Sequence, residues 1–234
     1  DIARPLTTPR PKSARGTLTF FLHAPGSLNA ETFKPSTTHF ARRDALARIA
    51  SAALWRGRGL MWEDTNEIAI LFEDNGLLRI SPRFVANCPV PSEFHLISVI
   101  GRAIERGDSP GIRIERPTAH STASSHMHRL VEEYSKTGRT IVTLLHEQFE
   151  QNLAFYSATD DDTGEAPRST LIFFLGAVKD MTGEEVGAVH RACRAFGVPC
   201  VEANLGQQPE FTSKIIDVLH GHHLHGRLMP AVVR

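Results

Sequence analysis

Two short loops carry the residues whose types and positions best suit ligand binding. Gly176 follows the apolar run Leu171–Leu175, and Gly206 follows Asn204 and Leu205. A glycine lets the backbone approach a ligand closely, because it has no side chain. In an open α/β sheet, ligands bind outside the carboxyl ends of the strands. The two loops therefore predict a ligand site at the ends of adjacent strands, and simple tight turns remain the alternative.

Other chemistries find less support in the sequence. Neutral imidazoles bind zinc, and four histidines lie close together at His220, His222, His223 and His225. No Cys or carboxylate completes a site there at helical spacing, so we expect no metal. The acidic run 160–162 does not keep the spacing of a calcium loop. Glycine-rich phosphate and dinucleotide fingerprints are missing, as is the nucleophile elbow of serine hydrolases.

Alternating strand and helix patterns must position the two loops. Apolar runs predict strands over residues 17–23, 67–72, 77–80, 112–115, 140–145, 171–175 and 198–202. Periodic apolar residues predict helices over residues 42–58, 94–105, about 126–136, 183–196 and 209–220. A capping box at Thr182 and Glu185 marks the start of the fourth helix. The alternation predicts an α/β fold with a mostly parallel sheet flanked by helices.

The composition is that of an ordinary globular protein, with 234 residues, 41% hydrophobic and 22% charged. No apolar stretch is long enough to be a membrane helix. The three cysteines argue against a disulfide framework and favour a reducing compartment. Residues 1–58 hold ten of the 26 Lys and Arg but three of the 26 acids. This basic part could contact phosphate; a solvated face with a basic tail is the alternative.

Short motifs in a constant order resemble the TrmY-type pseudouridine methyltransferases, a family of the SPOUT superfamily. Ala24-Pro25 after the first strand is similar to the family's Ala-Pro, and residues 109–114 (SPGIRI) to its Pro-Gly-Ile/Val-Thr-Val element. Leu145-His146-Glu147 resembles a Leu-His-Glu stretch of archaeal members. Residues 173–182 align without gaps on the family's Phe-Val-Leu-Ser-Asp-His segment and the residues after it. Asn204-Leu205-Gly206 falls on its Ser-Leu-Gly-Pro loop.

The resemblance implies one SPOUT-like domain over residues 17–234, after a basic Pro-rich tail at 1–16. It implies a trefoil knot over about residues 140–224, a homodimer, and methylation of N1 of pseudouridine in RNA. S-adenosylmethionine would be bound mainly by the backbone of three loops and the start of the last helix. The residues that match these positions are Leu145, His146, Glu147, Leu175, Gly176, Ala177, Asn204, Leu205, Gly206, Gln207, Ser213 and Ile215.

The chain departs from the family where polar groups could contact the target base. The family's Ser-Asp-His is replaced by Gly176-Ala177-Val178, and the Pro after Gly206 by Gln207. The closing His-Asn-x-Leu-Asp keeps only its histidine, His220. The missing groups are of the kind that could remove a proton from the base. We therefore assign no catalytic base.

These features predict an S-adenosylmethionine-dependent RNA methyltransferase that acts on rRNA or tRNA, with pseudouridine as the expected target. Arg42, Arg43, Arg48 and the basic tail are expected to bind the RNA. The alternative is a catalytically degenerate SPOUT protein that serves as an RNA-binding ribosome-assembly factor among ribosomal proteins. The Arg- and Pro-rich start favours a mitochondrial location, with a cytoplasmic one as the alternative. A nucleotide-dependent oxidoreductase lacks its glycine fingerprint.

Overall fold

Seven strands form one sheet in the computed structural model, which describes residues 16–34, 43–56, 61–63, 65–85, 88, 92–107, 109–153, 169–177, 180–205 and 211–224. The strands are β1 (Thr17–Ala24), β2 (Thr65–Phe72), β3 (Leu77–Ile80), β4 (Ile112–Glu115), β5 (Thr140–Leu145), β6 (Thr170–Gly176) and β7 (Cys200–Ala203). The helices are a short 3₁₀ turn η1 (Ala30–Phe33), α1 (Arg43–Leu54), α2 (Pro82–Val85), α3 (Glu93–Arg106), α4 (Ala123–Ser135), α5 (Gly183–Phe196) and α6 (Thr212–Leu224). No described helix has the length and apolarity needed to cross a membrane.

The strand order in the sheet is β4-β3-β2-β1-β6-β5-β7. The five strands from β2 to β7 in this order are parallel, and β3 and β4 are antiparallel additions at one end. The predicted α/β class with a mostly parallel sheet is therefore confirmed. One detail of the prediction is wrong, because β6 and β7 are not adjacent. The strand β5 lies between them and pairs with both.

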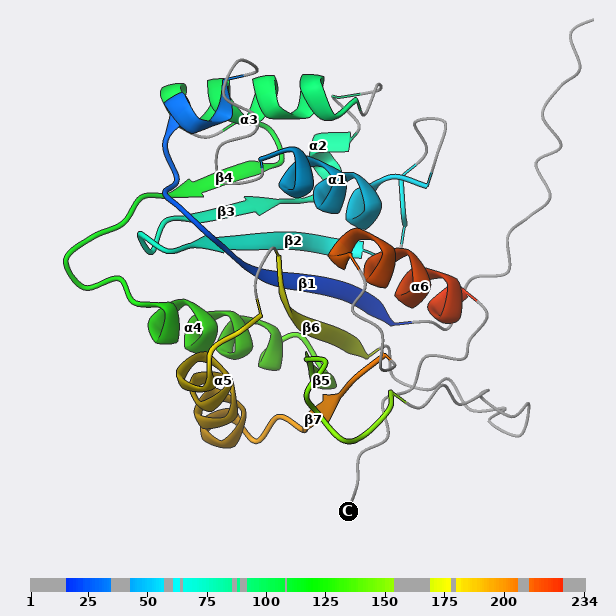
Figure 1. The fold of residues 1–234 in the computed structure, drawn as a ribbon. Helices are drawn as coiled ribbons and strands as arrows, with labels where there is room; N and C mark the ends of the chain where they lie inside the picture. Colours follow the sequence, from blue (N-terminus) through cyan, green and yellow to red (C-terminus); the bar gives the residue numbers. More distant parts are fainter. Residues whose placement is uncertain are drawn as a thin grey trace, which may run out of the picture.

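Helices cover both faces of the sheet, and two apolar clusters lie beneath them (Figure 1). The larger cluster packs under α1, α3 and α6, and the smaller one under α4 and α5. Neighbouring residues of β1 show the alternation that a strand requires, since Phe20 belongs to the larger cluster and Phe21 to the smaller. The chain therefore has a three-layer α/β/α architecture, which is the usual way to bury both faces of a parallel sheet.

Local signals at helix ends and turns are confirmed in detail. The capping box is complete. The backbone amide of Glu185 donates a hydrogen bond to the Thr182 hydroxyl, and the backbone amide of Thr182 donates one to the Glu185 carboxylate. The α5 helix ends at Gly197 with φ of 63°, a left-handed conformation that favours glycine. In the β2–β3 hairpin Asn75 has φ of 63°, as turns containing Asn-Gly require.

Candidate functional site

The candidate loops lie together at the carboxyl edge of β6, β5 and β7. The three strands are parallel, so the segments after Leu145, Leu175 and Ala203 leave the sheet on the same side. Side chains of Leu145 and Leu175 are buried in the larger apolar cluster, and Leu205 and Ile215 pack against that cluster. The candidate residues from three separate stretches of sequence are thus brought to one place. Gly206 and Gln207 lie outside the described residues.

The end of β7 is flanked by chain on both sides. The amide of His146, directly after β5, donates to the carbonyl of Ala203 at 3.1 Å. On the other side, the Asn204 amide donates to the Gln151 carbonyl and the Leu153 amide donates to the Asn204 carbonyl, each at 2.7 Å. Since the loop after β5 supplies both sets of partners, it passes around the end of β7 and holds it in a slot. We refer to this arrangement, residues 146–153 around Ala203 and Asn204, as the β7 slot.

The start of α6 is bonded to the loop after β6. The hydroxyl of Thr212 donates to the carbonyl of Gly176 at 2.7 Å, and the amide of Ala177 donates to the carbonyl of His23 at 2.9 Å. These contacts fix the first turn of α6, with Ser213 and Ile215, beside the carboxyl end of β6. The sequence motifs alone could not identify Thr212 as the residue that joins the two segments, because the hydrogen bond spans 36 positions.

His220 anchors the other half of α6. Its ring is fully buried and stacks on Trp62, with 4.1 Å between the ring centroids. Its Nε2 lies 3.3 Å from the Thr65 hydroxyl and 3.2 Å from the Ala53 carbonyl. The histidine that aligns with the family's closing motif therefore contacts α1 and β2 and holds α6 against them. Within the described residues, no group of three His, Cys, Asp or Glu side chains could hold a metal ion.

A histidine–carboxylate pair lies beside the loops, and the sequence patterns do not identify it. The Gln148 amide donates to Nδ1 of His146 at 3.1 Å, so the neutral ring carries its proton on Nε2. This Nε2 faces the Asp180 carboxylate, 4.0 Å away, across the ends of β5 and β6. At this distance His146 lies beside Asp180 without a direct hydrogen bond, and the Asp180 side chain is half exposed. The pairing joins residues 34 positions apart, and no local spacing indicates it.

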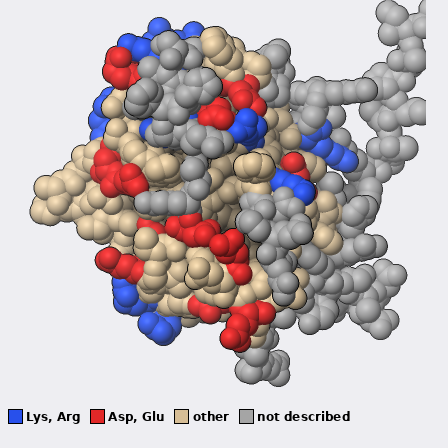
Figure 2. All heavy atoms as spheres, viewed as in Figure 1, with Lys and Arg blue, Asp and Glu red and all other residues tan. Residues whose placement is uncertain are grey.

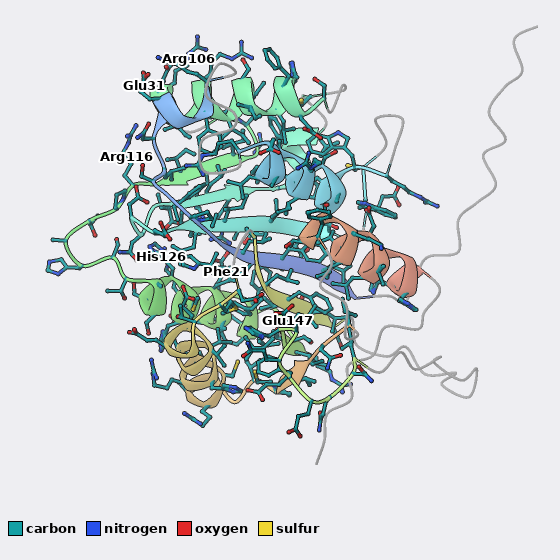
Figure 3. All side chains as sticks on the ribbon, viewed as in Figure 1. Phe21, Glu31, Arg106, Arg116, His126 and Glu147 are labelled. Carbon is teal, nitrogen blue, oxygen red and sulfur yellow. The ribbon has the colours of Figure 1, made fainter. Side chains whose placement is uncertain are left out.

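Acidic side chains dominate the surroundings of the loops. Glu147, Glu150, Asp180 and Glu202 are all exposed, and the described loop residues 145–153, 175–177 and 203–205 include no Lys or Arg. Figure 2 shows acidic side chains across the middle and lower part of the visible face, with basic ones along its upper edge and again at the lower left. In Figure 3, Glu147 lies near β5, whereas Arg106, Arg116 and the acidic Glu31 lie together in the upper part of the view. Contacts to phosphate must therefore come from other elements.

The three arginines expected to bind RNA have different surroundings. Arg43 is buried completely, and its guanidinium lies over the rings of Phe33 and Phe72 at 4.6 and 4.8 Å. Its Nη2 also donates to the Ser27 carbonyl at 2.8 Å. The prediction that Arg43 contacts RNA is therefore wrong, because this side chain belongs to the core. Arg48 is exposed beside Asp44 at 2.9 Å, and Arg42 lies outside the described residues.

Comparison with known proteins identifies the fold class, although no protein-family model matches the chain and no curated protein matches its sequence. The architecture is that of the SPOUT-type α/β fold. The particular similarity is to a crystal structure of Archaeoglobus fulgidus Nep1 bound to S-adenosylhomocysteine, with a TM-score of 0.54 and 12% identity. That match covers 91% of this chain and 99% of the archaeal one.

Two bacterial structures align less well. One is ribosomal RNA small subunit methyltransferase E from Neisseria gonorrhoeae bound to S-adenosyl methionine, at a TM-score of 0.36 and 10% identity, covering 88% of this chain and 64% of that one. The other is the Legionella pneumophila protein Lpg2936 with bound cofactor SAM, at a TM-score of 0.39 and 13% identity. That match covers 90% of this chain and 65% of the Legionella one. The present chain spans about two thirds of each, and these scores do not establish a shared fold.

Proposed function

We propose that the chain binds S-adenosylmethionine at the ends of β5, β6 and β7 and transfers its methyl group to RNA. The observation that carries this proposal is the meeting of three loops and the start of α6 at one edge, in a fold shared with a protein that was crystallised with S-adenosylhomocysteine. Backbone donors and acceptors of these loops suit a neutral adenine, and Leu205 and Ile215 offer apolar contacts.

The finer parts of the proposal rest on the sequence. We propose pseudouridine in rRNA or tRNA as the target and a trefoil knot over about residues 140–224. The β7 slot supports the knot, because a threaded chain needs a loop on both sides of it. Arg48 and the basic tail are the proposed RNA contacts, and the mitochondrion is the proposed compartment.

Calorimetry with S-adenosylmethionine and S-adenosylhomocysteine tests the binding site directly. We expect both to bind with a dissociation constant in the micromolar range, which corresponds to about −8 kcal/mol. Transfer of a labelled methyl group to total RNA, followed by nucleoside analysis, then tests the reaction and its target. If the protein binds S-adenosylmethionine but transfers its methyl group to no RNA, the proposed enzymatic activity is wrong and only the proposed cofactor site remains.

For the chemical step we propose Asp180 as the group that accepts the proton of the target nitrogen. Its half-exposed carboxylate lies at the edge where the loops meet, and Nε2 of His146 lies 4.0 Å from it. We expect Asp180→Asn to abolish methyl transfer and to leave the affinity for S-adenosylhomocysteine unchanged. Because Glu150 is exposed on the same edge, Glu150→Gln is a matched control that should keep the activity. Full activity of Asp180→Asn would overturn the assignment.

The second candidate function is that of an RNA-binding assembly factor without methyl transfer. Two observations favour it. The exposed side chains around the loops are acidic (Glu147, Glu150, Asp180 and Glu202), and Gly176-Ala177-Val178 stands in place of Ser-Asp-His. This function predicts that the folded protein binds neither cofactor form up to millimolar concentration, while it still associates with RNA or with ribosomal particles. The same calorimetry therefore separates the two functions.

We also propose a homodimer that uses the outer face of α6. Phe211 is 76% exposed and Val218 is 38% exposed, and their spacing of seven positions is that of one helix face. An exposed apolar stripe of this kind is typical of an interface. Light scattering should show a dimer for the full chain and a monomer for Val218→Asp. A monomer at every concentration of the unmodified protein would contradict the proposal.

A further inference from the structure

Two cysteines outside the candidate cofactor loops lie in the same apolar cluster, on either side of a tight turn. Cys193 is in the last turn of α5 and is 2% exposed, while Cys200 is the first residue of β7 and is partly exposed. The Val198 amide donates to the Cys193 carbonyl at 2.9 Å, which turns the chain back after Gly197. Cys200 packs against the smaller apolar cluster, of which Cys193 is a buried member, and both thiols are free.

One of the two thiols, that of Cys200, is accessible from one side. Cys200 lines a hollow of about 470 Å³ between the loop after β5 and the edge of β7, together with His190, Glu202 and residues 148–151. A small polar oxidant such as hydrogen peroxide can therefore reach Cys200. The third cysteine, Cys88, is buried in the larger cluster on the other face of the sheet. It is thus separated from the pair by the sheet and serves as an internal reference.

We infer that Cys193 and Cys200 are a redox-active dithiol that hydrogen peroxide converts to an intramolecular disulfide. One sulfur attacks the peroxide, the O–O bond breaks, and a sulfenic acid and one water form. The other sulfur attacks the sulfenic sulfur, the S–S bond forms, and a second water leaves. Two electrons pass from the sulfurs to the peroxide, and a thiol reductant reverses the step.

The acidity of the pair suits this chemistry. The hydrogen bond with Cys200 lowers the pKa of Cys193, so the thiolate forms more readily on that sulfur. The same contact raises the pKa of Cys200. Because peroxide reaches Cys200 and the thiolate forms more readily on Cys193, Cys193 is the sulfur that resolves a sulfenic acid formed on Cys200.

The disulfide would act on the strand that leads to the β7 slot. It would join the last turn of α5 to the first residue of β7, whose last residue, Ala203, contacts His146. Oxidation would therefore fix the first residue of this four-residue strand, whose last residue is already held by the His146 amide. The inference needs only the thiols and the hollow, and it holds whether or not the chain binds S-adenosylmethionine.

Peptide mapping of the full chain tests the inference. Trypsin cleaves after Arg191 and Arg194, so Cys193 falls in the tripeptide 192–194 and Cys200 in the peptide 195–214. Cys88 falls in the peptide 84–102. After treatment with hydrogen peroxide and alkylation of the remaining thiols, we expect one cross-linked species of 192–194 with 195–214, lighter than their sum by two hydrogens. Dithiothreitol should release both peptides.

Three serine variants sharpen the result. Cys88→Ser should keep the cross-link, whereas Cys193→Ser and Cys200→Ser should each remove it. The map of the unmodified protein decides the question even if a variant fails to fold. The inference is overturned if peroxide leaves both cysteines alkylated, if each is oxidised to a separate sulfinic acid, or if the disulfide joins Cys88 or two molecules.

Discussion

At the scale of single residues, Arg43 shows how a charged side chain can belong to the core. It precedes Leu46, Ala47 and Ala50 on the same face of α1, which is the buried face. Burial lowers the pKa of its guanidinium to about 10, so the group stays charged at neutral pH between two aromatic rings. The sequence contains this signal, because position 43 shares the helical period of the apolar residues. The charge of Arg43 alone would predict an exposed, basic side chain. Its position in the helical repeat of apolar residues predicts burial, which the structure shows.

This difference between two nearby arginines gives the first prediction. Arg43→Ala should lower the free energy of unfolding by about 3 kcal/mol, because it leaves a cavity in the core between Phe33 and Phe72. Arg48→Ala should change it by less than about 1 kcal/mol, since exposed ion pairs contribute little. Urea denaturation followed by circular dichroism measures both. Equal stability of the two variants would contradict the burial of Arg43.

The RNA contact of Arg48 can then be tested separately. Arg48→Glu should weaken RNA binding and reduce its dependence on salt, because each phosphate contact releases counterions. Filter binding at several salt concentrations measures the slope. Unchanged affinity and slope would exclude Arg48 from the RNA surface.

At the scale of elements, α6 connects the candidate loops to the rest of the fold. Thr212 joins its first turn to Gly176, and His220 joins its other half to α1 and β2. The helix is therefore held at both ends, and its first turn is positioned beside the loop after β6. Precise placement of a binding loop depends on such contacts from neighbouring elements.

The Thr212 hydrogen bond provides the next prediction. Thr212→Val keeps the shape of the side chain but removes the donor to the Gly176 carbonyl, which costs about 1 kcal/mol. We expect S-adenosylhomocysteine to bind about fivefold more weakly, with Thr212→Ser as the control that keeps the hydroxyl and the affinity. Calorimetry measures both variants. Equal binding by Thr212→Val would show that this hydrogen bond does not position the site.

Local elements can be predicted from the sequence more readily than their arrangement. The strand at Thr140–Leu145 and the capping box at Thr182 are predicted correctly, because apolar runs and caps are set by neighbouring residues. The position of β5 between β6 and β7 is not, because strand order depends on pairings across long stretches of chain. The same reason explains why no sequence pattern indicates the pairing of His146 with Asp180.

At the scale of the whole molecule, one ion-pair cluster links the sheet to the helix layer below it. Arg79 on β3 contacts Glu67 on β2 at 2.5 Å and Glu133 on α4 at 2.8 Å. Arg79 and Glu67 are nearly buried, while Glu133 is about half exposed. Removing one partner of a buried pair is strongly destabilising, because it leaves the other charge uncompensated.

This cluster predicts how stability depends on pH. The hydrogen bond from Arg79 lowers the pKa of Glu133 in the folded protein. The contact of Glu133 with Arg79 therefore stabilises the fold fully when the pH is above the pKa of Glu in the unfolded chain, about 4.3. This stabilisation is lost as the pH falls through the lower pKa of Glu133 in the folded protein. The difference in unfolding free energy between the unmodified protein and Glu133→Gln should shrink as the pH is lowered below about 4. A difference that stays constant over this range would contradict the assignment.

The β7 slot also bears on how the polypeptide is made. Synthesis runs from the amino to the carboxyl end, so residues 146–153 leave the ribosome before Ala203 and Asn204 exist. The end of β7 must then enter a gap whose walls are already present, or the walls must close around it afterwards. A nascent chain released before Cys200 would have an open gap where the finished protein has its edge strand.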